Sequence, residues 1–189
     1  MNLKKRQFLK SGICAIVDRN TLPKRFLRTK KITYIQIRKK NATSISLIKK
    51  IKTMKKKFGP YNVPIFVNDR IDVAVAANTD GLHIGKGDMD ISLARRILGK
   101  GCVIGKTVRN QKEARIAQKD GADYISIGPI FKTPFKKKIK LKGLAVLKKV
   151  KKTVNIPIVA IGGITFSNMD KVISSGADGV AMIRGVTQR

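Results

Sequence analysis

Eight short apolar runs alternate with stretches whose apolar residues recur at helical spacing, and this alternation limits the fold more than any other feature. The runs cover residues 13–18, 33–38, 64–69, 81–85, 102–107, 123–130, 157–163 and 179–185. Between the second and third runs, one stretch places apolar residues on a helical face: Leu47, Ile48, Ile51, Met54 and Phe58. We expect Ser44 to cap this helix and Gly59 to end it. Strands that alternate with helices predict βα units around a parallel sheet.

An internal repeat favours a closed barrel over an open sheet. The segments DGLHIG (80–85), GADYISIG (121–128) and GADGVAMI (176–183) each end one helix and begin the next strand. Two further helices are expected to open at capping boxes, Asn110 with Glu113 and Ser167 with Asp170. The predicted fold is an α/β protein of the (β/α)₈ or TIM barrel class, with residues 1–189 as a single domain.

The chain is short for this fold, which usually takes about 200 residues or more. Few residues separate the first two runs, and only residues 186–189 follow the eighth. We therefore expect a shortened first helix and a missing or truncated last helix. The seam between strands one and eight is then either open or covered by a partner subunit. Apolar surface at this seam would favour a homo-oligomer.

Acidic residues are scarce and concentrated. The chain has 42 Lys and Arg against 11 Asp and Glu, yet Asp69, Asp72, Asp80, Asp88 and Asp90 fall within 22 residues. Carboxylates placed where strands end are the usual ligands of a hard cation such as Mg²⁺. Helix caps and turns are the alternative explanation, which applies most to Asp72, Asp80 and Asp90 and least to Asp69 and Asp88.

The formal charge of +31 predicts weak, nonspecific nucleic-acid binding at low salt. Lysines spread over every predicted helix and an aromatic content of 5% argue against a dedicated binding surface for single strands. No apolar run approaches the roughly 18 residues of a membrane span. The isolated Cys14 and Cys102 are expected to be reduced core residues of a cytoplasmic protein.

Five segments, in order, carry a resemblance to a known family. They are QIRKK (36–40), VNDR (67–70), DGLHIGKGDM (80–89), GADYISIGPIFKT (121–133) and IPIVAIGGI (156–164). Together they resemble the thiamine phosphate synthase family from about Ile13 to Val186. The resemblance implies a transferase that joins hydroxymethylpyrimidine diphosphate to thiazole phosphate and releases pyrophosphate. It implies Mg²⁺ as cofactor and a dissociative reaction, in which the C–O bond to pyrophosphate breaks before the thiazole nitrogen attacks.

The resemblance also implies roles for particular residues. Gln36, Arg38 and Lys40 would line the pyrophosphate and pyrimidine site, and Asn68 would contact the pyrimidine. The other implied substrate-binding residues are Thr107 and Lys136 for the pyrophosphate, and Thr133, Gly163, Ile183 and Arg184 for the thiazole phosphate. The implied metal ligands are Asp69 and Asp88. Taken alone, Lys40 reads as surface charge, and Gly162–Gly163 reads as a tight turn as well as a phosphate contact.

Two residues depart from the family pattern. Phe135 stands where a second Thr is frequent, and Arg184 stands near a position that is usually small, where it either grips the thiazole phosphate or fills the pocket. The alternatives are a thiazole tautomerase-like protein, or a catalytically weakened barrel that binds nucleic acid or an acidic partner. Thiazole tautomerases, which share the fold, have a histidine after strand six where this chain has Pro129. This difference favours a synthase over a tautomerase. His83, within the fourth strand, is interpreted as a packing residue.

Overall fold

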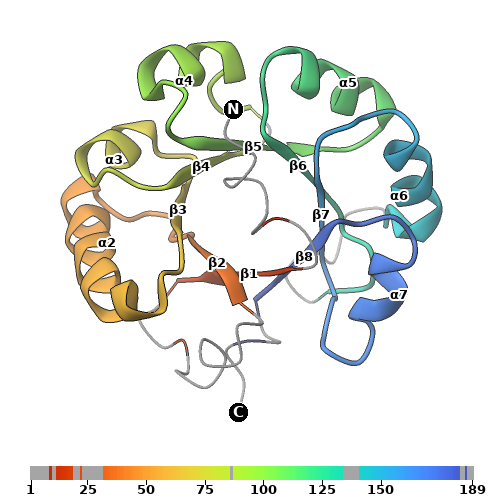
Figure 1. Cartoon of the computed structure of the whole chain (residues 1–189), viewed down its shortest axis with the longest axis horizontal. Helices are drawn as coiled ribbons and strands as arrows, with labels where there is room; N and C mark the ends of the chain where they lie inside the picture. Colours follow the sequence, from red (N-terminus) through yellow and green to blue (C-terminus); the bar gives the residue numbers. More distant parts are fainter. Residues whose placement is uncertain are drawn as a thin grey trace.

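The computed structural model describes residues 9, 12–18, 22, 32–85, 87–133, 141–183 and 186. Eight parallel strands form a closed barrel in sequence order (Figure 1). The strands are β1 (Gly12–Val17), β2 (Ile32–Ile37), β3 (Ile65–Asn68), β4 (Gly81–Ile84), β5 (Val103–Val108), β6 (Tyr124–Ile127), β7 (Ile158–Ile161) and β8 (Gly179–Met182). The predicted (β/α)₈ barrel is confirmed, and every strand matches one of the eight predicted runs, extending beyond it by at most one residue at either end.

Helices follow strands β2 to β7 and lie around the outside of the barrel (Figure 1). They are α2 (Ser44–Phe58), the 3-10 helix η3 (Gly59–Tyr61), α3 (Ile71–Ala76), α4 (Ile91–Leu98), α5 (Gln111–Lys119), α6 (Gly143–Lys151) and α7 (Met169–Ile173). Among the described residues, no helix is long and apolar enough to cross a membrane. The predicted helix of residues 44–58 is confirmed, with Leu47, Ile51, Met54 and Phe58 buried.

The prediction of an open seam is wrong. β1 pairs with β8 in parallel from Gly12 opposite Gly179 to Ala15 opposite Met182. Gly179 permits this approach, since a Cβ there would lie 2.8 Å from the Leu9 carbonyl oxygen and 3.0 Å from that of Gly12. Pairing satisfies the backbone donors and acceptors that two strand edges would otherwise leave open. The expected shortening of the first and last helices concerns stretches that lie largely outside the described residues.

The barrel wall separates two apolar clusters. Ile35, Ile65 and Ile104, among others, pack between the wall and the helices. Inside the barrel, the rings of Tyr34, Phe66 and Tyr124 lie within 6.3 Å of one another, centroid to centroid. Strand alternation sends successive side chains to opposite faces, so each strand contributes to both clusters.

Glycines in two strands make room for these rings. A Cβ on Gly81 would lie 2.6 Å from the Phe66 ring, and one on Gly105 would overlap the Tyr124 ring. Large rings on some strands thus fill the interior, and glycines on the adjacent strands leave room for them. The space for ligands therefore lies at the ends of the barrel.

The repeated Asp-containing segments have a common structural role. Asp80, Asp123 and Asp178 each precede a strand, and their carboxylates accept hydrogen bonds from the backbone N–H groups of Ile65, Ile104 and Ile158 at 2.8, 2.8 and 2.9 Å. Each of the three aspartates thus ties the start of its own strand to the start of the preceding one. For Asp80 this agrees with the structural alternative considered for the acidic cluster.

The predicted helix caps are partly correct. Asn110 accepts from Glu113 N at 2.9 Å, as expected of a capping residue. The N-cap of α2 is Thr43, whose hydroxyl accepts from Ser46 N, so the assignment to Ser44 is wrong by one residue. The Ser167 capping box is also wrong, because α7 begins at Met169 after Asn168. Short polar residues are adjacent in both places, and only the backbone path selects between them.

Candidate active site

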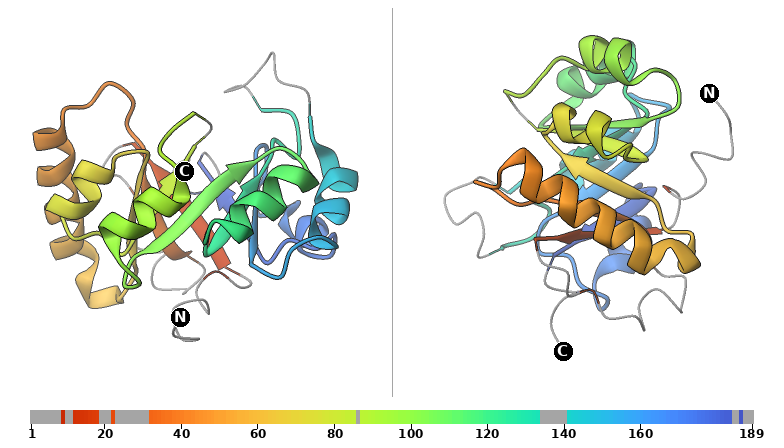
Figure 2. Two further views of the ribbon diagram at one scale, coloured as in Figure 1. Left: turned by 90° about the horizontal axis from the view of Figure 1, so that it is seen from above. Right: turned by 90° about the vertical axis from the view of Figure 1, so that its left-hand side faces the viewer.

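The loops that follow the strands rise from the carboxyl end of the barrel. In the left view of Figure 2, the loops after β2 and β4 rise on the same side of the barrel. The residues that end β2, β3, β4 and β5 therefore meet at one rim. This end of a TIM barrel is where reactive groups are usually found.

Asp69 and Asp88 come together at this rim. Asp69 follows β3 and has a φ of 63°, and its Oδ1 accepts a hydrogen bond from Gly85 N at 3.0 Å. A Cβ on Gly85 would lie 3.2 Å from Asp69 Oδ1 and 2.5 Å from Asp88 Oδ2. The two carboxylates thus lie over the same glycine, from loops that follow adjacent strands, and any side chain at position 85 would displace them.

The proximity of the two acids changes their chemistry. Burial, followed by hydrogen bonding and charge repulsion from Asp88, raises the pKa of Asp69 to about 6, against the lowering effects of Gly85 N–H and Arg38. A divalent cation between the carboxylates would relieve this repulsion. No group of three or more His, Cys, Asp or Glu suited to a metal occurs in the described part of the chain. Two carboxylates suit Mg²⁺, which keeps several water ligands and adds substrate phosphate oxygens.

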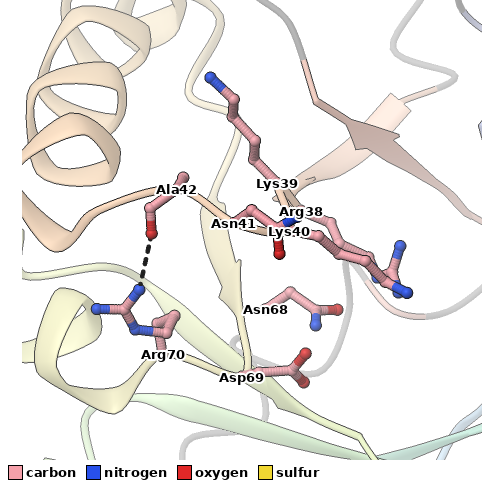
Figure 3. Close-up of a pocket in the computed structure, with 8 residues that line it drawn as sticks. All are labelled: Arg38, Lys39, Lys40, Asn41, Ala42, Asn68, Asp69 and Arg70. Carbon is pink, nitrogen blue, oxygen red and sulfur yellow. Dashed lines mark hydrogen bonds between the residues drawn. The ribbon is translucent and has the colours of Figure 1, made fainter.

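A basic pocket of about 140 Å³ adjoins Asp69 (Figure 3). Its lining residues are Arg38, Lys39, Lys40, Asn41, Ala42, Asn68, Asp69 and Arg70. Figure 3 shows Arg38 and Lys40 extending to the same side as Asn68 and Asp69, whereas Lys39 points away. The pocket therefore combines cations, an amide and a carboxylate, which suits an anionic ligand that also binds a metal ion.

The side chain of Arg70 extends away from those of Arg38 and Lys40 (Figure 3). Its guanidinium donates to the Ala42 carbonyl at 3.1 Å and pairs with Asp72 at 2.6 Å. Hydrogen bonds from Arg70 hold the pKa of Asp72 at about 2. Asp72 is thus an ion-pair partner on α3, in agreement with the structural alternative for this member of the acidic cluster.

Gln36 and Asn68 form a hydrogen-bonded pair inside the rim. Gln36 Nε2 donates to Asn68 Oδ1 at 2.6 Å, and the thiol of Cys14 lies 3.8 Å from Gln36 Oε1. Gln36 is buried, and Asn68 is partly exposed beside the basic pocket. The bond to Gln36 fixes the orientation of the Asn68 amide and leaves its NH₂ group as the donor for a ligand.

Thr107 forms a hydrogen bond with the buried side chain of His83. The ring nitrogens of His83 lie 2.9 Å from the Thr107 hydroxyl and 2.9 Å from the Tyr124 hydroxyl. Burial, with the nearby charges of Lys106 and Arg38, lowers the pKa of His83 to about 4. His83 is buried, but its contact with Thr107 escaped the sequence analysis, because residues 83 and 107 are brought together only by the pairing of β4 with β5.

Lys106 is a second residue that the sequence analysis missed. Its ammonium group donates to the Gly85 carbonyl at 2.8 Å and so ties β5 to the loop that carries Asp88. A lysine inside an otherwise apolar run was the signal that could have identified it.

The remaining predicted residues are more dispersed. Thr133 and Ile183 are partly buried at the ends of the segments that follow β6 and β8. Gly163 has a φ of 67°, and a Cβ there would lie 2.5 Å from the Lys132 carbonyl oxygen, so this position requires glycine for packing alone. Phe135, Lys136 and Arg184 lie outside the described residues.

Comparisons of the sequence with known proteins identify the same family of relatives. A family model described as thiamine monophosphate synthase matches residues 15–186. The thiamine-phosphate synthase of Clostridium novyi (strain NT) is 44% identical over 155 residues, which cover 82% of this chain and 76% of that protein. The thiamine-phosphate synthase of Clostridium botulinum (strain Loch Maree / Type A3) is 39% identical over 183 residues, covering 93% and 89%.

Solved structures extend the similarity to the fold. The thiamine phosphate pyrophosphorylase from Pyrococcus furiosus matches with a TM-score of 0.84 and 36% identity, over 96% of this chain and 90% of that one. FabK from Thermotoga maritima matches with a TM-score of 0.74 at 19% identity, which indicates a shared barrel alone.

Proposed function

The chain belongs to the thiamine monophosphate synthase family and is an enzyme of thiamine phosphate synthesis, and we propose that it works with a Mg²⁺ ion held by Asp69 and Asp88. Its substrates are small molecules, a pyrimidine diphosphate and a thiazole phosphate, and its products are thiamine phosphate and pyrophosphate. The observation that carries the metal proposal is the convergence of the two carboxylates over Gly85. When bound, Mg²⁺ would neutralise negative charge on the diphosphate as it becomes a leaving group.

The basic rim would bind the diphosphate. Arg38 presents a forked set of donors that can contact two phosphate oxygens, and Lys40 adds a point charge on the same side of the pocket. Thr107 adds a hydroxyl at the end of β5, beside the loop with Asp88. Lys106 and Arg38 both act electrostatically on His83, which lies beneath this region.

The Gln36–Asn68 pair would orient the pyrimidine. Because its carbonyl oxygen is occupied by Gln36, Asn68 can offer its NH₂ group to a ring nitrogen of the substrate. An oriented pyrimidine allows the C–O bond to the diphosphate to break while its ring stabilises the resulting cation. The thiazole nitrogen then attacks that carbon, and no side chain has to remove a proton.

Catalysis under this proposal is electrostatic. The rim residues hold the pyrophosphate where its charge develops, and the barrel holds the two reacting atoms in line. Thr133, Gly163, Ile183 and Arg184 would bind the thiazole phosphate, and Lys136 would contact the pyrophosphate. The roles of Lys136 and Arg184 rest on the family resemblance. The cytoplasmic location and the homo-oligomer expected from the sequence stay predictions.

The test is a condensation assay with both phosphorylated halves that follows thiamine phosphate and pyrophosphate together. We expect product with Mg²⁺, no product with excess EDTA, and a loss of at least 100-fold, roughly two orders of magnitude, in Asp88→Ala. Asp90→Ala, a change of the same type two residues away, is the matched control. Condensation that persists in EDTA, or in Asp88→Ala, would disprove the metal proposal and leave the family assignment intact.

A further inference from the structure

His83 is hydrogen-bonded at both ring nitrogens by hydroxyl groups. Nδ1 lies 2.9 Å from Tyr124 Oη, and Nε2 lies 2.9 Å from Thr107 Oγ1. His83 is 6% exposed, and both hydroxyl partners are uncharged. A neutral imidazole has one N–H donor and one acceptor nitrogen, so it donates one of these hydrogen bonds and accepts the other.

The direction of the Tyr124 bond selects between the two tautomers. A phenolic hydroxyl is much more acidic than the alkyl hydroxyl of threonine and is therefore the stronger hydrogen-bond donor. Of the two hydroxyl groups that contact His83, that of Tyr124 donates to Nδ1, and that of Thr107 accepts from Nε2–H.

The position of the Tyr124 ring is enforced by packing. The ring is 1% exposed, and Gly105 leaves the space that it occupies, since a Cβ there would overlap the ring. Its centroid lies 5.7 Å from that of His83. The hydroxyl therefore has little freedom to leave Nδ1.

We propose that Tyr124 holds His83 as the Nε2-protonated tautomer, and that His83 thereby turns the hydroxyl hydrogen of Thr107 toward the diphosphate. Thr107 Oγ1 accepts from Nε2–H, so its single hydrogen points elsewhere. In the opposite tautomer that hydrogen would be donated to Nε2, and the lone pairs of Thr107 would face an anion. His83 is thus a positioning residue that acts through Thr107. The inference rests on the proposed function, since the contact of Thr107 with the diphosphate belongs to it.

The tautomer can be measured directly, because His83 is the only histidine in the chain. Histidine-selective ¹⁵N labelling of the full chain gives signals from one imidazole. We expect Nε2 to carry the proton and Nδ1 to be unprotonated, in the protein without substrates. A protonated Nδ1, alone or in an imidazolium, would overturn the proposal. This measurement needs no turnover, so it is independent of whether the metal proposal holds.

Variants test the link to catalysis. Tyr124→Phe keeps the ring and the imidazole but removes the hydroxyl, so we expect a mixture of tautomers in the ¹⁵N spectrum. We expect kcat to fall about tenfold, with KM for the pyrimidine diphosphate nearly unchanged, because the donor matters most as charge develops on the leaving group. Tyr61→Phe removes the same atom from a residue outside the site and should change neither measurement. An unchanged tautomer and kcat in Tyr124→Phe would overturn the proposal.

A double-mutant comparison separates positioning from structural support. His83→Gln can still donate to Thr107 through its amide and should retain more activity than His83→Leu. If His83 acts through Thr107, His83→Leu should have little further effect on kcat in a Thr107→Val background. If its loss instead multiplies that of Thr107→Val in full, the role of His83 is structural and the proposal is wrong. Should His83→Leu fail to fold, the Tyr124→Phe arm and the ¹⁵N measurement still decide.

Discussion

Replacing Asp69 by Asn is expected to stabilise the protein in the absence of metal while abolishing its function. The pKa of Asp69 is raised from 3.8 to about 6 by burial and by Asp88. At about 1.4 kcal/mol per pKa unit, the folded state would be destabilised by at most about 3 kcal/mol at neutral pH. Solvent reaches the side chain and screens the charge, so we expect about 1 kcal/mol. For a chain of this length that is a rise in Tm of about 2–4 °C.

The sign depends on pH in a defined way. The folded protein binds the Asp69 proton more tightly than the unfolded chain does, so the destabilisation develops as pH rises from 3.8 to about 6 and is complete above that range. The advantage of Asp69→Asn should therefore be full at pH 7.5 and absent near pH 4. Added Mg²⁺ should raise the Tm of the native protein and not that of the variant, because only the native protein binds the ion.

The assay is thermal unfolding followed by circular dichroism, in EDTA and in Mg²⁺, at both pH values. Asp88→Asn is the control, because it removes the same charge repulsion and leaves position 69 unchanged. The left-handed backbone at position 69 favours Asn as well as Asp, so Asp69→Asn adds no backbone strain. The reasoning fails if both variants melt at or below the native protein in EDTA at pH 7.5. It also fails if Mg²⁺ stabilises Asp69→Asn as much as the native protein.

Further predictions concern the framework of the barrel. Gly105→Ala should lower the free energy of unfolding by about 2 kcal/mol or more in urea, because its Cβ would overlap the Tyr124 ring; a Tm within 1 °C, roughly the measurement error, would contradict this. Asp123→Asn should lower the free energy of unfolding by about 3 kcal/mol, because it breaks the 2.5 Å ion pair between Arg95 and the buried Asp123 carboxylate. Asp80→Asn should have a smaller effect, because Asp80 makes the same type of strand contact but is exposed. Asp72→Asn should lower stability by less than about 1 kcal/mol at pH 7, an effect that disappears as pH falls from about 4 to about 2, because the pKa of Asp72 is held at about 2 by Arg70.

Residue order explains which parts of the site could be predicted. Asp69 and Asp88 follow neighbouring parallel strands, and parallel strands bring their carboxyl ends to one rim, so their proximity could be inferred from the strand pattern alone. The pairing of Gln36 with Asn68 has the same origin, since β2 and β3 are adjacent and the two residues face the interior. Identification of the family rested on five ordered segments, each of which is weak when taken singly.

The eight strands, their order and the acids and cations at the carboxyl rim could all be inferred from the amino-acid sequence. Hydrophobic period is a local property of the chain, and consecutive βα units place consecutive strands side by side. Packing in three dimensions sets the rest: β1 and β8 close the seam, His83 contacts Thr107 beneath the rim, and Lys106 holds the loop of Asp88. It also separated Asp72 and Asp80, which have framework roles, from Asp69 and Asp88. These outcomes depend on strand register and on which side chains fill the interior, and both are set by packing between residues far apart in the sequence.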